Sequence, residues 1–113
     1  MIYELRSYDI DPPLLDNYLA WANDSALPLL VGRFGFRLVG FWHAIAPTQP
    51  VAGAAPATNV HWIIAWVSED EMNAQWSAAR ASAEWAAINT DRPKTHLRVQ
   101  VTLLRAIPRS PFQ

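Results

Sequence analysis

Cysteine is absent from this chain of 113 residues, and several kinds of chemistry are excluded with it. Without cysteine there are no disulfides, no thiolate nucleophiles and no cysteine-ligated zinc or iron–sulfur sites. The absence is compatible with the reducing cytoplasm, where we expect the protein to reside.

Charge of one sign and long apolar runs are also lacking. The formal net charge is -1, so electrostatics does not favour nucleic acid or an anionic membrane as a partner. No apolar run reaches the roughly 18 residues of a membrane-spanning helix. No basic segment leads into an apolar stretch near Met1, so we expect no signal peptide. The composition favours one globular domain over residues 1–107, followed by an irregular tail over 108–113.

Two strands are predicted at the ends of the domain. Alternation over residues 2–10 places Glu4 and Arg6 on one face of the first strand. The last strand, over 97–107, alternates apolar odd positions with polar Arg98 and Gln100. Because these strands are expected to be neighbours, we predict a buried Glu–Arg network across a dimer, with Arg98 and Gln100 nearby.

Two helices are predicted between the strands. The first starts with Asp11 as N-cap and Pro12 at its first position, and carries a buried stripe as far as Leu30. Pro28 is expected to kink or shorten its last turn. The second starts with a capping box from Ser68 to Glu71.

Two apolar strands are predicted over 36–46 and 59–67, joined by a Pro- and Ala-rich loop over 47–58. With no helix between them they should form an antiparallel hairpin. The β-α-β-β-α-β order predicts an α+β, ferredoxin-like fold, with a four-stranded antiparallel sheet and both helices on one face. The apolar second and third strands indicate that the open face is covered, most simply by a second copy in a homodimer.

Several stretches form a pattern that spans the chain: Met-Ile-Tyr-Glu-Leu-Arg-x-Tyr at the start, Ala26-Leu27-Pro28, the run 36–42 with its Leu-Val-Gly-x-Trp core, Trp66 before an acidic helix start, and Glu84-Trp85. Together these stretches resemble NIPSNAP-family domains. The resemblance covers nearly the whole chain and implies a dimeric α+β barrel, related to antibiotic-biosynthesis monooxygenases and small isomerases. Pro12-Pro13 stands where the family usually has Pro-Gly, and Ile64 stands where members often have histidine.

His43 and His61 are the candidate catalytic residues. If the hairpin turn centres near Gly53, positions summing to about 106 pair, and the two imidazoles are neighbours on one face. Such a pair can act as general acid and base near neutral pH. The alternative is a pair of hydrogen-bonded sheet histidines at the dimer interface, because a slip of one residue separates them. His96 is set apart from the pair, and two histidines without a carboxylate make a poor metal site, so we expect no metal or other cofactor.

Six tryptophans are many for this length, and they must fill a core, an interface or a pocket. The same register places three of them on the face opposite the two histidines, and two aromatic residues lie on the first helix. An aromatic wall of this kind suits a planar hydrophobic ligand in a pocket between sheet and helices. The candidate substrate-binding residues are Tyr18, Trp21, Trp42, Trp62 and Trp66.

Three functions are compatible with these features. The leading hypothesis is a small cofactor-independent enzyme, a monooxygenase, cyclase or isomerase, acting on an aromatic or polyketide-like metabolite. The alternative is a non-catalytic homodimer that binds a small apolar ligand or a partner protein. A third reading is a structural dimer with a filled interior and no pocket.

Overall fold

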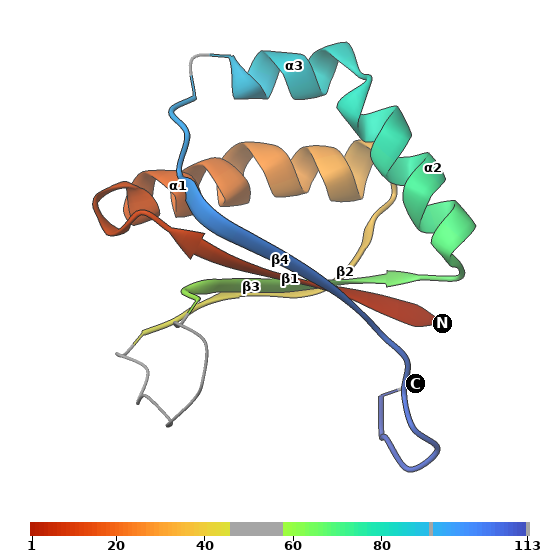
Figure 1. Ribbon diagram of the computed structural model, residues 1–113. Coiled ribbons are helices and arrows are strands. Elements are labelled where there is room, and N and C mark those ends of the chain that lie inside the picture. Colours follow the sequence, from red (N-terminus) through yellow and green to blue (C-terminus); the bar gives the residue numbers. More distant parts are fainter. Residues whose placement is uncertain (46–57, 91, 113) are drawn as a thin grey trace.

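A computed structural model describes residues 1–45, 58–90 and 92–112. Four strands form one antiparallel sheet in the order β2-β3-β1-β4, and the helices lie together on one of its faces (Figure 1). The predicted α+β, ferredoxin-like fold is thus confirmed. Within the described residues, no helix has both the length and the apolar character needed to cross a membrane.

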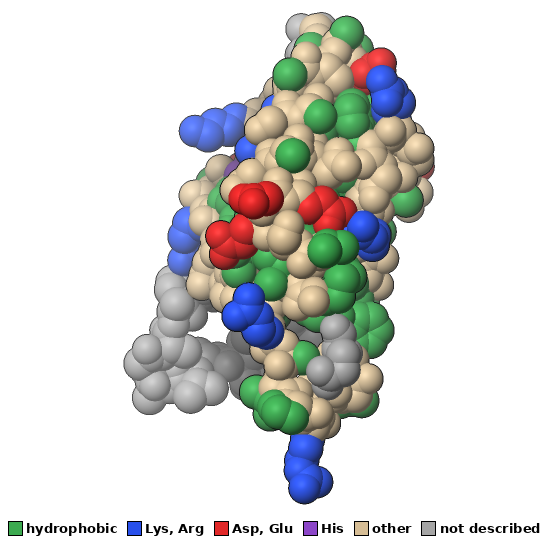
Figure 2. Space-filling view, turned by 90° about the vertical axis from the view of Figure 1, so that its right-hand side faces the viewer, with side chains coloured by type: hydrophobic (Ala, Val, Ile, Leu, Met, Phe, Trp, Pro, Cys, Tyr) green, Lys and Arg blue, Asp and Glu red, His purple; other side chains and the backbone are tan. Residues whose placement is uncertain are grey.

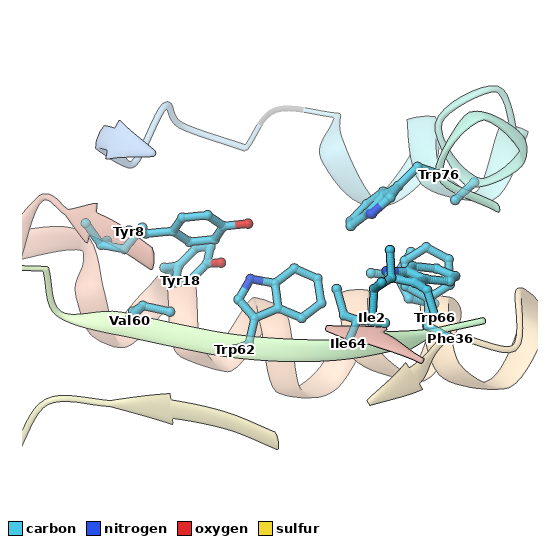
Figure 3. Close-up of a cluster of buried hydrophobic side chains, with 12 residues drawn as sticks. Ile2, Tyr8, Tyr18, Phe36, Val60, Trp62, Ile64, Trp66 and Trp76 are labelled. Atoms are coloured by element: carbon cyan, nitrogen blue, oxygen red, sulfur yellow. The ribbon is translucent and has the colours of Figure 1, made fainter. Parts of the chain in front are cut away.

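The sheet is built around β1 (Ile2–Ile10). It pairs with β3 (Val60–Trp66) on one side and with β4 (His96–Leu104) on the other. Even-numbered residues of β1 and β3 point toward the helices and form the floor of the hydrophobic core (Figure 3). The predicted bounds of β1 are those observed, whereas β4 ends three residues before the predicted end at 107.

The first helical segment runs without a break from Pro12 to Arg33 (Figure 1). A 3-10 turn, η1 (Pro12–Leu14), leads into α1 (Leu15–Trp21), and two wide π-type segments follow, η2 (Ala22–Ala26) and η3 (Pro28–Arg33). Proline has no N–H to donate, and the widened turns accommodate Pro28 without ending the helix. The expected kink or shortening at Pro28 is therefore replaced by a local change of helix type. This segment buries Tyr18 and Leu30 against the sheet.

The other helices are α2 (Glu69–Arg80) and α3 (Ala83–Asn89). Ser68 Oγ accepts a hydrogen bond of 3.1 Å from the Glu71 N–H, as the capping box predicts. The Glu71 carboxylate in turn accepts from the N–H of Val67, one residue before the cap. On the side of the molecule shown in Figure 2, acidic and basic side chains are interspersed with apolar ones, as expected from a net charge near zero.

The hairpin of β2 (Arg37–His43) with β3 is confirmed, but its predicted register is wrong. His43 pairs with Val60, and Trp42 pairs with His61, so paired positions sum to 103 rather than about 106. An odd sum places His43 and His61 on opposite faces, because side chains alternate along a strand. The loop predicted over 47–58 lies, apart from Thr58, outside the described residues, as does residue 46 at the predicted end of the second strand.

The predicted surroundings of Glu4 and Arg6 are also wrong. Both residues lie on the helix-covered face of β1, and Glu4 is 1% exposed. Arg98 pairs with Asp9, and Gln100 with Ser7, so both project from the opposite, uncovered face of the sheet. The Glu4–Arg6 pair is therefore part of the core of a single chain, where α2 covers it, and does not meet Arg98 or Gln100.

Candidate ligand-binding cavity

A cavity of about 220 Å³ lies between the sheet and the helices. Its walls come from β1, β2, β3 and the start of β4, from the first helical segment, and from α2 and α3. Aromatic rings make up a large part of the lining: Tyr8, Tyr18, Trp21, Phe41, Trp62, Trp76 and Trp85. A concave apolar site with a few polar groups is the usual form of a small-molecule pocket.

Trp62 forms part of the floor of this cavity, from the middle of β3. The residue is 5% exposed, yet its indole N–H has no hydrogen-bond partner. By contrast, the buried indoles of Trp66 and Trp76 both donate to Glu4 Oε1 at 2.9 Å. A buried donor without an acceptor costs about 1–3 kcal/mol, so an acceptor that enters the cavity would recover this energy.

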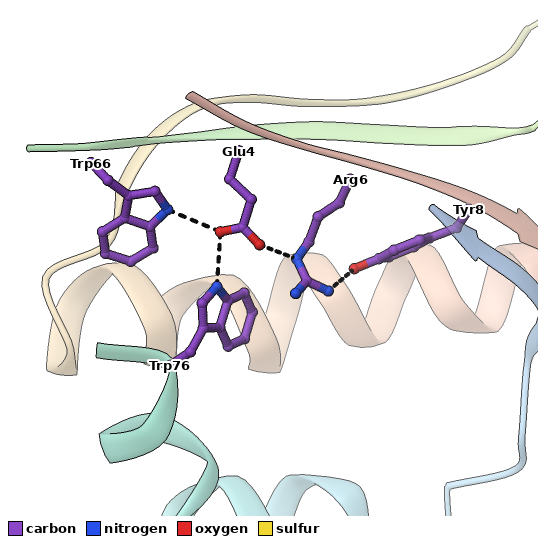
Figure 4. A network of polar contacts seen from close by, with 5 residues as sticks. All are labelled: Glu4, Arg6, Tyr8, Trp66 and Trp76. Carbon is purple, nitrogen blue, oxygen red and sulfur yellow. Dashed lines mark hydrogen bonds and ion pairs between the residues drawn. The ribbon is translucent and has the colours of Figure 1, made fainter. Parts of the chain in front are cut away.

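Glu4 and Arg6 form a polar row under α2 (Figure 4). While Oε1 of Glu4 accepts from the two indoles, Oε2 accepts from Arg6 Nε at 2.7 Å. Arg6 Nη1 donates to the hydroxyl of Tyr8 at 3.1 Å, and the guanidinium lies 4.5 Å from the ring centre of Trp76. Burial alone would lower the pKa of Arg6, but Tyr8 and Glu4 outweigh it and raise the pKa above its ordinary value. The guanidinium therefore stays charged at the cavity wall.

Cations outnumber anions in the lining. Arg6, Arg80 and Arg92 border the cavity, and no aspartate or glutamate is among the described lining residues. Arg92 stacks over Trp21 with 4.0 Å between the guanidinium carbon and the ring centre, and Arg80 lies 4.7 Å from the ring of Trp76. The cavity thus combines an apolar interior with a positive rim, which favours ligands that carry a negative oxygen.

His96 is the titratable base of the cavity. Its ring stands edge-on to Tyr8 and Tyr18 at 4.6 and 5.2 Å between ring centres, and Nδ1 is 3.2 Å from the Thr95 hydroxyl. Burial, and then the charges of Arg92 and Arg6, lower the pKa of His96 below 6.5. Burial also raises the pKa of Tyr18 well above its ordinary value. At neutral pH the cavity therefore holds a neutral imidazole, able to accept a proton, beside a protonated phenol.

The NIPSNAP family model matches residues 3–111. The chain belongs to the NIPSNAP family. Among solved structures it is similar to protein Atu4242 from Agrobacterium tumefaciens, with 18% identity, a TM-score of 0.80 and full coverage of both chains. It is also similar to the NIPSNAP family protein Atu5224 from the same organism, with 17% identity, a TM-score of 0.81, and 99% and 98% coverage.

A more distant likeness is to an antibiotic biosynthesis monooxygenase, with 15% identity, a TM-score of 0.54, and coverage of 96% of this chain and 100% of the other. Similarities at these identities show a shared fold and do not carry an activity with them. No curated protein matches the sequence.

Three of the five predicted substrate-binding residues of this NIPSNAP protein, Tyr18, Trp21 and Trp62, line the cavity. Trp66 lies on the same face of the sheet but is fully buried beside Glu4, outside the lining. Trp42 was expected on the face of Trp62; the observed register places it on the opposite, uncovered face, where it is half exposed.

The two predicted catalytic histidines are not brought together. His43 is exposed near the end of β2 and does not line the cavity. His61 lies on the uncovered face, where its ring nitrogens are 3.1 Å from Ser7 Oγ and 3.2 Å from Thr58 Oγ1. A joint acid–base role therefore lacks the proximity on which it depended, while the contribution of either residue alone stays a prediction.

His96, Arg80 and Arg92 are charged or titratable cavity residues that the sequence did not indicate. His96 is predicted to lie before the last strand, away from the His43–His61 pair, whereas the observed β4 begins at this residue. The available signal was strand adjacency: in a β-α-β-β-α-β sheet the last strand runs antiparallel to the first, so the start of β4 meets the end of β1. The observed pairing of His96 with Ile10 brings the imidazole onto Tyr8.

Proposed function

We propose that this NIPSNAP-family protein is a small cofactor-independent enzyme that binds a planar, hydrophobic metabolite in the cavity between sheet and helices. The observation that carries the proposal is a neutral histidine, His96, in an aromatic cavity whose wall holds the charged Arg6. The rings around the cavity supply the binding surface for an aromatic or polyketide-like body.

The proposed chemistry begins with a proton transfer. His96 accepts a proton from an acidic C–H or O–H of the substrate, and an enolate or phenolate forms in the cavity. Arg6 and the free N–H of Trp62 stabilise the negative oxygen, because both are donors held in the cavity wall before the substrate binds. Isomerisation, cyclisation and oxygenation by dioxygen can all proceed from such an anion, and they define the candidate reaction classes.

Turnover of candidate quinol and polyketide substrates tests this proposal. We expect His96→Asn to lower kcat by about 10²- to 10⁴-fold, the usual contribution of a general base. His43→Asn and His61→Asn in the same assay test the roles predicted for them from the sequence. If either of these variants loses turnover while His96→Asn keeps it, the reaction takes place outside the cavity and the proposal is wrong. If a ligand quenches the tryptophan fluorescence but no product forms, the protein is a non-catalytic binding module instead of an enzyme.

We also propose a homodimer formed by the uncovered sheet face. Trp42 is half exposed there, and the adjacent β1 and β3 positions Tyr3, Leu5 and Ile63 are only partly buried. On the edge strand β4, the exposed side chain of Leu104 pairs with Tyr3 and adds to this face. An apolar face of this extent is typical of a surface that a partner covers.

A further inference from the structure

The unpartnered indole N–H of Trp62 points to the kind of ligand that the cavity takes. Trp62 is 95% buried, and its N–H is the one buried side-chain donor without a partner in the described part of the chain. Figure 3 shows the indole nitrogen on the ring edge that faces the layer between sheet and helices, on the side of Tyr8 and Tyr18. Since both tyrosines line the cavity as well, the donor is directed into it.

A second donor is available beside it. Arg6 is held by two hydrogen bonds, from Nε to Glu4 and from Nη1 to Tyr8, which fix the plane of the guanidinium. Its Nη2 group has no hydrogen bond to any described residue. The guanidinium carbon lies 6.0 Å from the ring centre of Trp62, so both donors border the same part of the cavity.

No carboxylate among the described lining residues balances the charged donors of this cavity. The carboxylate of Glu4 accepts from Trp66, Trp76 and Arg6, and it is not part of the lining. Arg92, half-buried at the rim, has neutral partners, Asn89 and Thr95. An anionic oxygen of a ligand would satisfy a buried N–H and offset the positive charge in one step.

From this arrangement we infer that the ligand is a planar aromatic monoanion whose acidic oxygen, of a carboxylate or an enolate, binds Trp62 Nε1 and Arg6 Nη2. The inference rests on the proposed function for the place of binding and adds the chemical class. A neutral hydrocarbon of the same shape would fill the aromatic walls but leave both donors unpaired, and a cation would meet the arginines. The cavity thus selects by charge as well as by shape.

Naphthalene-2-carboxylate and its neutral analogue naphthalene-2-carboxamide are the probes that test this. Binding to the full chain at neutral pH is followed by tryptophan fluorescence and by calorimetry. We expect the carboxylate to bind at least about tenfold more tightly than the carboxamide, since charge-assisted hydrogen bonds are roughly twice as strong as neutral ones. Equal binding would overturn the inference and leave the proposed function standing. If neither probe binds, the inference and the proposed pocket fail together.

Trp62→Phe and Trp21→Phe form a matched pair of variants. Both residues line the cavity, but the N–H of Trp21 is already bonded to the carbonyl of Ile88 at 2.8 Å. We expect Trp62→Phe to reduce the carboxylate-to-carboxamide preference about fivefold or more, and Trp21→Phe to leave that ratio unchanged. In the wild type, the indole N–H resonance of Trp62 should shift on adding the carboxylate. A preference unchanged in Trp62→Phe, with no such shift, would overturn the role of this donor.

The acidic enol 2-hydroxy-1,4-naphthoquinone separates the two sources of the anionic oxygen. Preference for naphthalene-2-carboxylate identifies a carboxylic acid as the ligand class, and preference for the hydroxyquinone identifies an acidic enol. In either case the preference must depend on Trp62; binding of both anions that Trp62→Phe leaves unaltered would contradict the inference.

Discussion

Trp76 donates its indole N–H to Glu4 Oε1 at 2.9 Å, across 72 positions of the sequence, and so joins α2 to the central strand β1. The same oxygen accepts from Trp66 of β3 (Figure 4). The opening stretch that marks the family is therefore where one carboxylate joins a helix and two strands.

Replacing Glu4 by glutamine should strongly destabilise the fold. The glutamine amide retains an oxygen for the two indoles, but its NH2 group replaces the oxygen that accepts from Arg6. The guanidinium of Arg6 then loses its counter-charge and faces another hydrogen-bond donor in the core. Breaking a buried ion pair from one side costs about 3–5 kcal/mol. We expect that loss in the free energy of unfolding, measured by urea denaturation. Glu84→Gln, at an exposed position in the first turn of α3, is the control and should change it by less than about 0.5 kcal/mol.

Trp76→Phe and Trp62→Phe should differ in their effect on stability. The first removes a hydrogen bond to a carboxylate, a bond of the kind that contributes about 1.5–3 kcal/mol. The second removes an N–H that has no partner in the free protein. We therefore expect a lower urea midpoint for Trp76→Phe and a midpoint close to that of the wild type for Trp62→Phe. Equal destabilisation by both would mean that the Trp62 N–H is satisfied in solution.

Local patterns sufficed for much of the fold. The alternation of residues 2–10 gave the limits of β1, and Ser68 with Glu71 marked the start of α2, because both signals act over a few neighbouring positions. The order of elements was then enough for the sheet topology. The helix type around Pro28 depended on how the segment packs, which no short pattern reports.

The site was harder to predict because it depends on pairings between distant segments. The predicted hairpin register rests on an assumed turn centre near Gly53, with paired positions that sum to an even number. The observed pairs from Gly40 to His43 have an odd sum, which reverses the face of these residues relative to β3, and a register shift between Leu38 and Gly40 restores an even sum at Leu38. Trp42 and His43 exchanged faces for this reason. His96 enters the cavity through its pairing with β1, a contact across most of the chain.

The pH dependence of stability should report His96. Its pKa is lowered by burial and by Arg92 and Arg6, so the unfolded chain takes up this proton at a higher pH than the folded one. Between the lowered pKa and 6.5 the unfolded state binds more protons, and stability therefore falls as the pH drops through that window. From about pH 7.5 to about pH 5, wild type should lose more stability than His96→Gln. If both proteins lose the same stability over this range, the pKa of His96 is not lowered. The control is His43→Gln, which shows how the removal of an exposed histidine changes stability.

The proposed homodimer can be tested at two adjacent positions of one strand. Trp42 and His43 are both exposed, but they point to opposite faces of β2. Trp42 lies across Gly40, where a Cβ would overlap its indole ring, so the ring is spread over the uncovered face of the sheet. A negative charge in place of this ring would be buried in a sheet-to-sheet interface without a partner, whereas the same charge at position 43 would stay on the helix side.

Light scattering at micromolar concentration measures whether a negative charge at position 42, or at position 43, dissociates the dimer. We expect Trp42→Glu to raise the dissociation constant of the dimer by at least about 100-fold, since an unpaired charge is costly in a buried apolar contact. His43→Glu should leave the mass unchanged, and its far-ultraviolet circular dichroism should match that of Trp42→Glu, which shows that both variants fold. A monomeric wild type would remove the homodimer altogether. A dimer that survives Trp42→Glu but dissociates in His43→Glu would place the interface on the helix side.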